Sequence, residues 1–171
     1  FNILERLGNK MDTGKLLMLL EKNGKLTHAQ LAAMLNSTRE EIAALVSELE
    51  TNKVILGYGA VIDWEKTGRE LVTAMIEVKV VPQRGEGFDR VASRIYQYDE
   101  VDSIYLMSGG FDLMVMLAGK TLKEVALFVA QKLAVMDAVS STATHFVLKK
   151  YKDRGVIFSS APDVDRRTPL G

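Results

Sequence analysis

The sequence has few residues of the types that catalysis and metal binding most often use, and only a few basic residues that could contact phosphate groups. The chain has no cysteine and only two histidines, His28 and His145, and neither belongs to a Ser-His-Asp set, a metal-ligand cluster or a glycine-rich phosphate loop. Both histidines are expected to be structural, so the sequence predicts no enzymatic activity, no metal and no cofactor. The basic residues that could contact phosphates are Lys22, Lys25, Arg39 and Lys53.

Three short helical patterns carry these basic residues. The first has an apolar face of leucines, and Asp12 or Thr13 can cap its start. The second pattern opens at Thr27 and the third at Thr38, each with a capping box that pairs a threonine with Gln or Glu three residues later. In the third helix, apolar residues recur at Ile42, Leu45, Val46 and Leu49. Two capped helices separated by a short break, with a third helix before them, are typical of a helix-turn-helix.

In a helix-turn-helix, the last helix lies in the major groove of DNA with its N-terminal half beside the bases. The residues predicted to contact DNA are Thr27, Thr38, Arg39, Glu40, Ala43, Ala44, Ser47 and Lys53. Residues 38–53 contain two basic and four acidic side chains, a net charge of 2 − 4 = −2. Since phosphate neutralisation supplies most nonspecific affinity, we expect one copy of this segment to bind weakly. A three-helix bundle used for dimerisation is the alternative interpretation.

The second half of the chain alternates between strand and helix patterns. Strand patterns cover residues 71–81, 101–108, 111–117 and 142–151, with Gly109-Gly110 as a hairpin turn between the middle two. The apolar faces of the two helices are predicted to be Phe88, Val91, Ala92 and Ile95, and then Leu122, Val125, Ala126, Val129 and Leu133. The order βαββαβ is that of the ferredoxin-like split unit.

Helices cover only one face of such a sheet, so the other face needs a different cover. The residues expected on that face are Met75, Tyr105, Met107, Met114 and Met116. A second copy of the sheet is the simplest cover, and we therefore predict a homodimer that associates through sheet faces. The alternative is that the N-terminal helices or the C-terminal tail cover this face.

The predicted fold class is α+β, with an N-terminal helix-turn-helix at 1–60, a linker at 61–70, a βαββαβ domain at 71–152 and a tail at 153–171. Trp64 is expected to be a packing anchor rather than a ligand-stacking residue. Residues 156–158 are expected to form a short strand, with disorder or partner contact beyond Pro162, and residues 1–10 could form an extra helix. No apolar run approaches 18 residues, so no membrane span is expected. The absence of cysteine fits a reducing cytoplasm.

Three stretches of this sequence resemble the Lrp/AsnC family, the feast/famine regulators that respond to amino acids. The first stretch is the set of helical patterns from Leu16 to Leu49. The second, NKVILGYGAVID at 52–63, is similar to the family's pattern apolar-Ile-x-Gly-Tyr-x-Ala-x-apolar-Asp. The third, SGGFDLMV at 108–115, resembles the family's Gly-x-Tyr-Asp segment. The resemblance covers about residues 12–152.

The resemblance implies a winged or extended helix-turn-helix joined to an amino-acid-sensing domain. The partners that it implies are double-stranded DNA, an amino-acid-type effector, and further copies of the chain in dimers or octamer-like rings. The effector-binding residues that it implies are Gly109, Gly110, Phe111, Asp112, Thr142 and Thr144. Asp112 could pair with the ammonium group, and backbone amides near Gly109 could hold the carboxylate. A hairpin turn stabilised by Asp112 is the alternative.

The third helix departs from this family, whose typical members carry several arginines there. This sequence instead has Ala44, Leu45, Ser47 and Glu48. An assembly of linked heads would partly compensate, because linking raises the effective concentration of each site. We therefore predict a DNA-binding transcriptional regulator modulated by an amino acid or related metabolite. Two alternatives are a ligand-sensing assembly protein with weak or lost DNA binding and an enzyme similar to the sirohaem decarboxylases.

Overall fold

The computed structural model describes residues 12–69, 71–81 and 87–158. The chain divides into two compact units, of which the first ends at Val61 and the second begins at Ile62. We call them the head and the sheet unit. The predictions for residues 1–10 and for the chain beyond Pro162 lie outside the described residues. No helix among the described residues is long and apolar enough to cross a membrane.

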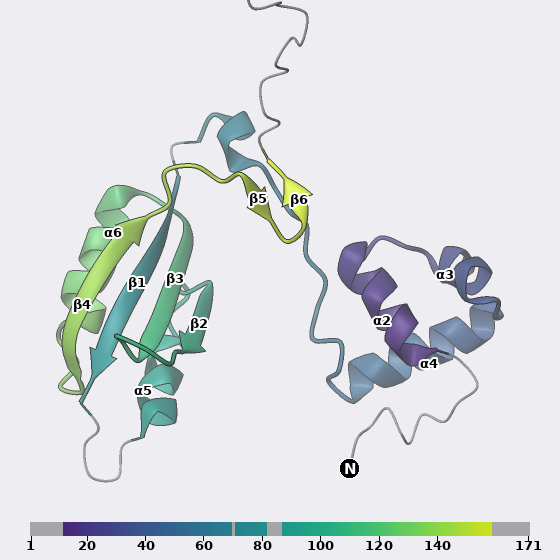
Figure 1. Ribbon diagram of the computed structural model, residues 1–171, viewed down its shortest axis with the longest axis horizontal. Coiled ribbons are helices and arrows are strands. Elements are labelled where there is room, and N and C mark those ends of the chain that lie inside the picture. The colour runs from purple at the N-terminus through teal and green to yellow at the C-terminus, as the bar shows by residue number, and fades with distance from the viewer. Residues whose placement is uncertain (1–11, 70, 82–86, 159–171) are drawn as a thin grey trace, which may run out of the picture. The chain divides into compact units, whose positions relative to one another are not determined.

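The described part of the head contains three helices, α2 (Thr13–Lys22), α3 (His28–Leu35) and α4 (Arg39–Thr51) (Figure 1). The Asp12 side chain caps α2, and both predicted capping boxes are confirmed, at Thr27 for α3 and at Thr38 for α4. These caps satisfy backbone N–H groups that have no partner within a helix. The helices pack around a small apolar core of Leu16, Leu20, Leu31, Ala32, Ile42, Val46 and Leu49.

The sheet unit has the predicted order of strands and helices. Its elements are β1 (Val72–Val80), α5 (Phe88–Ile95), β2 (Ser103–Leu106), β3 (Leu113–Lys120), α6 (Leu122–Phe128), a π-helical turn η2 (Val129–Leu133) and β4 (Val139–Phe146). The strands lie side by side in the order β2-β3-β1-β4, and every neighbouring pair is antiparallel (Figure 1). This arrangement confirms the ferredoxin-like fold.

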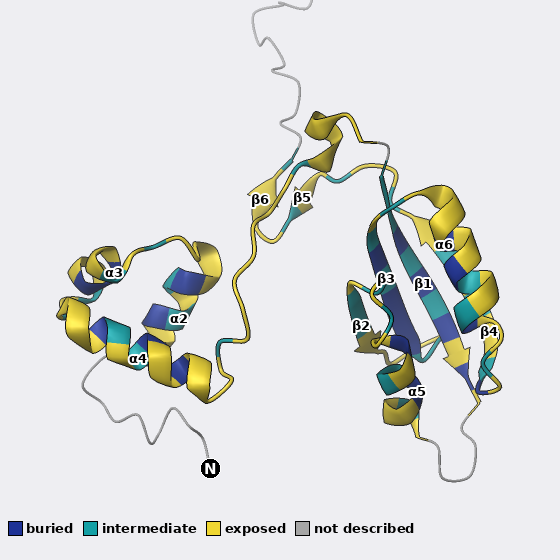
Figure 2. Ribbon diagram, turned by 180° about the vertical axis from the view of Figure 1, so that it is seen from behind, coloured by how far each residue is buried: buried dark blue, intermediate teal, exposed yellow. Residues whose placement is uncertain are grey.

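One face of the sheet packs against α5 and α6 (Figure 2). Alternate residues of β1, from Ala74 to Val80, are buried there, as the period of two predicts. They pack with residues from β3 and from both helices, and the buried core is Ala74, Ile76, Val78, Val80, Val91, Ile95, Leu113, Val115, Leu117, Val125, Phe128, Leu133 and Ala138.

The predicted apolar face of the second helix was partly wrong. Leu122 is 57% exposed and Ala126 is exposed, whereas Phe128, which was not predicted to face the core, is buried. Phe128 directly precedes the π-helical turn η2. A π-helix advances five residues per hydrogen-bonded turn, so Phe128 and Leu133 share a face that α-helical spacing does not predict.

Several predicted strand boundaries also differ. The hairpin between β2 and β3 is six residues long, from Met107 to Asp112, rather than a two-residue turn, and of its two glycines only Gly109 has positive φ (147°). The last strand begins at Val139 rather than 142 and ends at Phe146 rather than 151. Its last paired residue is Phe146, opposite Ala74, and the Val147 amide still donates to the Thr73 carbonyl near the start of β1.

A small substructure surrounds the start of β1 and the end of β4. It consists of the 3₁₀ helix η1 (Trp64–Thr67) and a two-stranded ribbon of β5 (Lys152–Asp153) and β6 (Val156–Ile157). The predicted short strand at 156–158 therefore lies in this ribbon. Trp64, Leu71, Val147 and Phe158 help to line a groove of about 60 Å³ within the substructure. Trp64 is 42% exposed, so its packing against another part of the chain or a partner stays a prediction.

Candidate DNA interface and ligand-sensing loop

The start of α3 and the start of α4 lie beside the same hollow of the head. The hollow has a volume of about 410 Å³ and is lined by Lys25, Leu26, Thr27, His28, Ala29 and Arg39. Two of the predicted phosphate-contacting cations, Lys25 and Arg39, thus meet at two helix N-termini. The N–H groups and the dipole of a helix N-terminus favour an anion, so this surface can hold a phosphate of a nucleic acid.

The outer surface of α4 carries two parallel stripes of the predicted DNA-contacting residues. Arg39, Ala43 and Ser47 follow at intervals of four and therefore share one face of the helix. Ala43 and Ser47 line a second hollow of about 270 Å³, which also includes Leu20, Gly24, Leu26, His28, Val46, Glu50 and Tyr58. The neighbouring stripe of Glu40, Ala44 and Glu48 is exposed to solvent.

Two other predicted contact residues build the helix caps. The Thr27 hydroxyl accepts a hydrogen bond from the Gln30 amide at 3.2 Å and donates one to Gln30 Oε1 at 3.1 Å. The Thr38 hydroxyl accepts from the Glu41 amide, also at 3.2 Å. Their first role is therefore to fix the helix starts. Lys53, the last predicted contact, is exposed, follows the end of α4 and has positive φ (58°).

Residues 12–61, the described part of the head, have slightly more acidic than basic side chains, and the whole head has no net charge. Residues 12–61 contain five Lys or Arg and six Asp or Glu, a net charge of 5 − 6 = −1. The basic residues are Lys15, Lys22, Lys25, Arg39 and Lys53, and the acidic ones are Asp12, Glu21, Glu40, Glu41, Glu48 and Glu50. The positive charge that phosphate binding needs is therefore restricted to a few positions near the ends of the helices.

Tyr58 attaches the segment after α4 to the rest of the head, and sequence reasoning missed this role. Its hydroxyl donates a hydrogen bond to Glu50 Oε1 at 2.9 Å. Its ring packs so closely on Gly24 that a Cβ atom there would lie 3.1 Å from Tyr58 Cδ1. Partial burial and then the hydrogen bond to Glu50 raise the pKa of the Tyr58 hydroxyl. Tyr58 belongs to a motif that the sequence analysis identified, but Gly24, on which its ring packs, lies 34 residues earlier in the chain.

The loop from Met107 to Asp112 contains four of the predicted effector-binding residues. Gly109 and Gly110 are exposed, and an added Cβ at either would meet no atom within 4 Å. Space is therefore not the reason for glycine here. The reason at Gly109 is its φ of 147°, which other residues adopt rarely. Phe111 and Asp112 are partly buried.

Asp112 joins this loop to the end of β1. Its carboxylate Oδ2 accepts a hydrogen bond from the Val80 amide at 2.7 Å, and its own amide donates to the Val78 carbonyl at 3.1 Å. Its carbonyl accepts from the Met107 amide at 2.8 Å, which closes the hairpin. Asp112 thus stabilises the turn, as the alternative interpretation held, and any contact with an effector would be an additional role.

The two threonines predicted to complete the effector site lie on the other side of β1. Thr142 pairs with Val78 and Thr144 with Ile76, so both threonines share the helix-covered face of the sheet. Asp112 directly precedes β3, and both threonines lie in β4. β1 lies between these two strands, which are therefore about 10 Å apart at the usual strand spacing. One chain therefore does not bring Asp112 and the threonines together around the head group of one amino acid.

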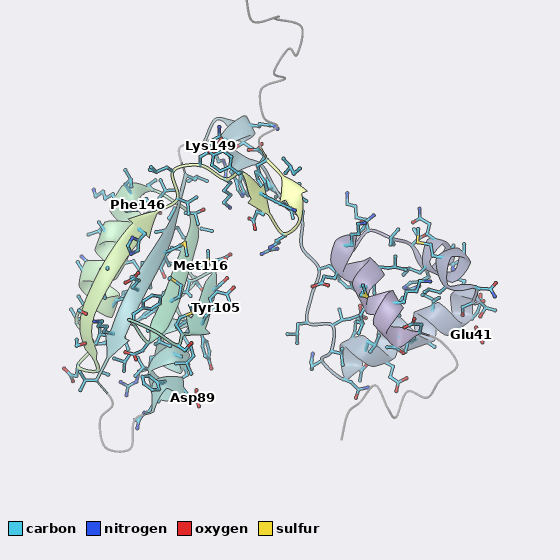
Figure 3. All side chains as sticks on the ribbon, in the orientation of Figure 1. Glu41, Asp89, Tyr105, Met116, Phe146 and Lys149 are labelled. Atoms are coloured by element: carbon cyan, nitrogen blue, oxygen red, sulfur yellow. The ribbon has the colours of Figure 1, made fainter. Side chains whose placement is uncertain are left out.

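The sheet face opposite the helices is largely uncovered within the chain. The strand register places Ser103, Met116, Met75 and His145 in one row across it and Tyr105, Met114, Glu77 and Ala143 in the next. Four of the five residues predicted for this face are therefore in these rows, and Tyr105 is 52% exposed (Figure 3). His145 Nε2 lies 3.1 Å from Glu77 Oε1, so these rows combine methionines and a tyrosine with this polar pair and Ser103.

Comparison with known proteins identifies a family model and relatives that match this chain. Residues 73–157 match the model of the Lrp/AsnC ligand binding domain. The chain is 47% identical over 154 residues to the uncharacterized HTH-type transcriptional regulator YugG of Bacillus subtilis, which spans 90% of this chain and 92% of that protein.

Two solved structures share the fold. PH0061 has a TM-score of 0.71 and 25% identity, covering 88% of this chain and 100% of that one. The transcriptional regulator NMB0573 of Neisseria meningitidis, solved as a complex with L-Met, has a TM-score of 0.67 and 22% identity, covering 81% of this chain and 89% of that one. On its similarity to YugG and its match to the domain model, the chain belongs to the Lrp/AsnC family of transcriptional regulators.

Proposed function

We propose that this regulator binds duplex DNA through α3 and α4 and that an amino acid or related metabolite modulates the binding. The main support for DNA binding is the hollow that Lys25 and Arg39 line beside the N-termini of α3 and α4. Phosphates held at these N-termini would fix the head on the backbone of the duplex. The exposed surface of α4 would then lie in the major groove.

The side chains along α4 suit base edges better than phosphates. Ala43 and Ala44 carry methyl groups that can pack on the thymine methyl, and the Ser47 hydroxyl can bond to either kind of base edge. Glu40 and Glu48 can each accept a hydrogen bond from the amino group of cytosine. Specific contacts of this kind would supply affinity that the charge of the head does not.

We place the effector site at the 109–112 loop of one chain together with the Thr142 and Thr144 region of another. Support comes from the separation of these two regions by β1 in a single chain, since an α-amino acid carries both charged groups on one carbon atom. The complex of NMB0573 with L-Met supports the ligand class, because that protein shares this fold.

A site shared between chains would couple ligand binding to assembly. The uncovered sheet face favours a homodimer, since apolar surface such as Met75 and Met116 gains stability when buried. Dimers would associate further, as in an octamer, to complete the effector sites. An amino acid would then shift the population of assembly states by binding one of them more tightly.

The test measures binding of the full chain to the promoter of its own gene by fluorescence anisotropy at several salt concentrations. A scrambled duplex of equal length is the control, and each duplex is titrated with and without L-Met, L-Leu and L-Asn. We expect preference for the promoter and a change in affinity or stoichiometry with at least one amino acid. Equal binding to both duplexes at every salt concentration would refute promoter recognition.

The lack of a net positive charge on the head favours one alternative, a sensing and assembly protein that has lost DNA binding. The two functions predict different results in two measurements, the thermal shift with an amino acid and the binding to duplex DNA. The alternative predicts a thermal shift with an amino acid and no binding to either duplex at low salt. Binding to the promoter at low salt would exclude it.

A further inference from the structure

The substructure at the end of the sheet unit carries a cluster of positive charge that the DNA-binding helices lack. Residues 149–154, KKYKDR, contain four basic residues and one acidic residue, a net charge of 4 − 1 = +3. The segment connects β4 to the ribbon of β5 and β6 (Figure 3). We define the ribbon patch as the exposed cations Arg69, Lys149, Lys152 and Arg154.

Among the described residues, no carboxylate forms an ion pair with the ribbon patch. Within the described residues, the two acidic groups that form ion pairs here bind other lysines: Asp153 contacts Lys150 at 3.4 Å and Asp63 contacts Lys66 at 3.0 Å. None of the four patch residues has an ion pair with a described residue. Their positive charge therefore faces solvent and can attract a polyanion.

Aromatic rings hold two of the patch cations in place. Lys149 Nζ lies 5.2 Å from the centre of the Tyr151 ring, and Arg69 Cζ lies 5.8 Å from the centre of the Trp64 ring. Both distances are within the range of a cation–π interaction. Such contacts restrict long side chains in advance and so reduce the entropy that is lost when they bind a phosphate.

The ribbon itself places Arg154 at the tip of a tight turn. Arg154 and Gly155 have φ of 45° and 79°, and the flanking pair Asp153 and Val156 is in register. Two residues with positive φ are the geometry of a type I′ hairpin turn. An arginine is uncommon in this conformation, which Asn or Gly adopts with less strain. Arginine at this position places an exposed cation in the turn of the ribbon.

We propose that the ribbon patch is a second DNA-binding surface, which contacts phosphates of the same duplex that the head reads. The inference rests on the proposed DNA-binding function and names the source of the phosphate contacts. The segment 149–154, with a net charge of +3, complements the polyanion, whereas residues 12–61 of the head have a net charge of −1. Because both surfaces belong to one chain, binding through one raises the effective concentration of the other.

The test uses two matched charge reversals in the full chain, Lys152→Glu in the ribbon patch and Lys123→Glu on α6. Both lysines are exposed and have no ion pair with a described residue. Affinity for the promoter and for a scrambled duplex is measured across salt concentrations. Each phosphate contact contributes about 0.9 to the slope of log K against log salt, which is nearly tenfold in affinity at 0.1 M salt.

We expect Lys152→Glu to weaken binding to both duplexes by about tenfold at 0.1 M salt and to reduce the slope by about one. Lys123→Glu should change neither quantity by as much. Equal slopes and affinities for the two variants would overturn the proposal. Tighter binding to single-stranded RNA than to duplex DNA, with the same sensitivity to Lys152→Glu, would also overturn it.

The same data separate this proposal from the proposed function. If the wild-type protein binds promoter and scrambled duplex equally, promoter recognition fails, but the comparison of the two variants still decides whether the ribbon patch contacts phosphates. If the wild-type protein prefers the promoter and the two variants behave alike, the ribbon patch proposal fails alone. A wild-type protein that binds neither duplex at 50 mM salt refutes both.

Discussion

Replacing Asp112 separates a structural role from a ligand-binding one. The Val80 amide that Asp112 binds is at the end of β1, and the Val80 residue is only 7% exposed. Asp112→Ala removes the acceptor and leaves a buried N–H group without a partner. Such a group costs about 1–3 kcal/mol of stability. In Asp112→Asn, the amide oxygen can still accept, but a neutral hydrogen bond is about half as strong as a charge-assisted one.

The expected loss is therefore about 1–3 kcal/mol for Asp112→Ala and about half of that for Asp112→Asn. For a domain of this size, each kcal/mol lowers the melting temperature by about 4–8 °C. Thermal unfolding of the full chain is followed by tryptophan fluorescence, because the single tryptophan, Trp64, belongs to the sheet unit. Asp99→Ala, at an exposed position, is the control and should leave the melting temperature unchanged.

The same variants test whether the carboxylate also binds an effector. If Asp112 pairs with the ammonium group of an amino acid, Asp112→Asn loses that charge and should abolish the thermal shift given by the amino acid. The modest loss of stability would then accompany a complete loss of the ligand response. The structural reasoning is refuted if Asp112→Ala melts within 1 °C of the wild type, and the effector role is refuted if Asp112→Asn keeps the full ligand-induced shift.

Three further perturbations test other parts of the structure. Gly24→Ala should displace the Tyr58 ring, because the new Cβ would lie 3.1 Å from it, and chymotrypsin should then cleave at Tyr58 several-fold faster than in the wild type. Met116→Glu should convert a dimer to monomers in sedimentation experiments. The substitution removes the about 1.5–3 kcal/mol that burial of one methionine side chain contributes, and a two-fold interface contains this position twice. A hydrogen bond from a lysine on η2 lowers the pKa of Glu100 in the folded protein. This hydrogen bond therefore stabilises the fold fully when the pH is above the pKa of the unfolded chain, near 4.5, and the stabilisation is lost as the pH falls through the lower pKa of the folded protein. In urea titrations, Glu100→Gln should thus be less stable than the wild type at pH 6, and the difference should shrink below about pH 4.5. A difference independent of pH would contradict this reasoning.

The sequence predicted most reliably the features that depend on nearby residues. The capping boxes at Thr27 and Thr38 use a partner three residues away, and the alternation of β1 depends on a period of two. The π-helical turn after α6 was not predicted because nothing in the local pattern distinguishes it from a continued α-helix. Phe128 and Leu133 reveal it only once their common burial is known.

The contacts of the candidate sites depend instead on distant residues. Asp112 binds Val80, which is 32 residues earlier, and Tyr58 packs on Gly24, which is 34 residues earlier. The sequence indicated that Thr142 and Thr144 share a face, but only the register with β1 shows that this is the helix-covered face. Patterns along the chain identify such residues as candidates, whereas the fold decides what each one touches.

The charge distribution determines how strongly this regulator would depend on assembly. If all four candidate cations of one head contacted phosphates, the slope of log K against log salt for that head would be at most about 3.6 in magnitude. A rise from 50 to 200 mM salt would then weaken its affinity for DNA by about 150-fold. Two linked heads double the slope, and the ribbon patch adds to it. A dimer would therefore bind far more tightly than one head at low salt and lose that advantage steeply as salt rises. An effector that shifts assembly would then control DNA binding without touching the DNA-binding helices, which is a mechanism that suits a head without net positive charge.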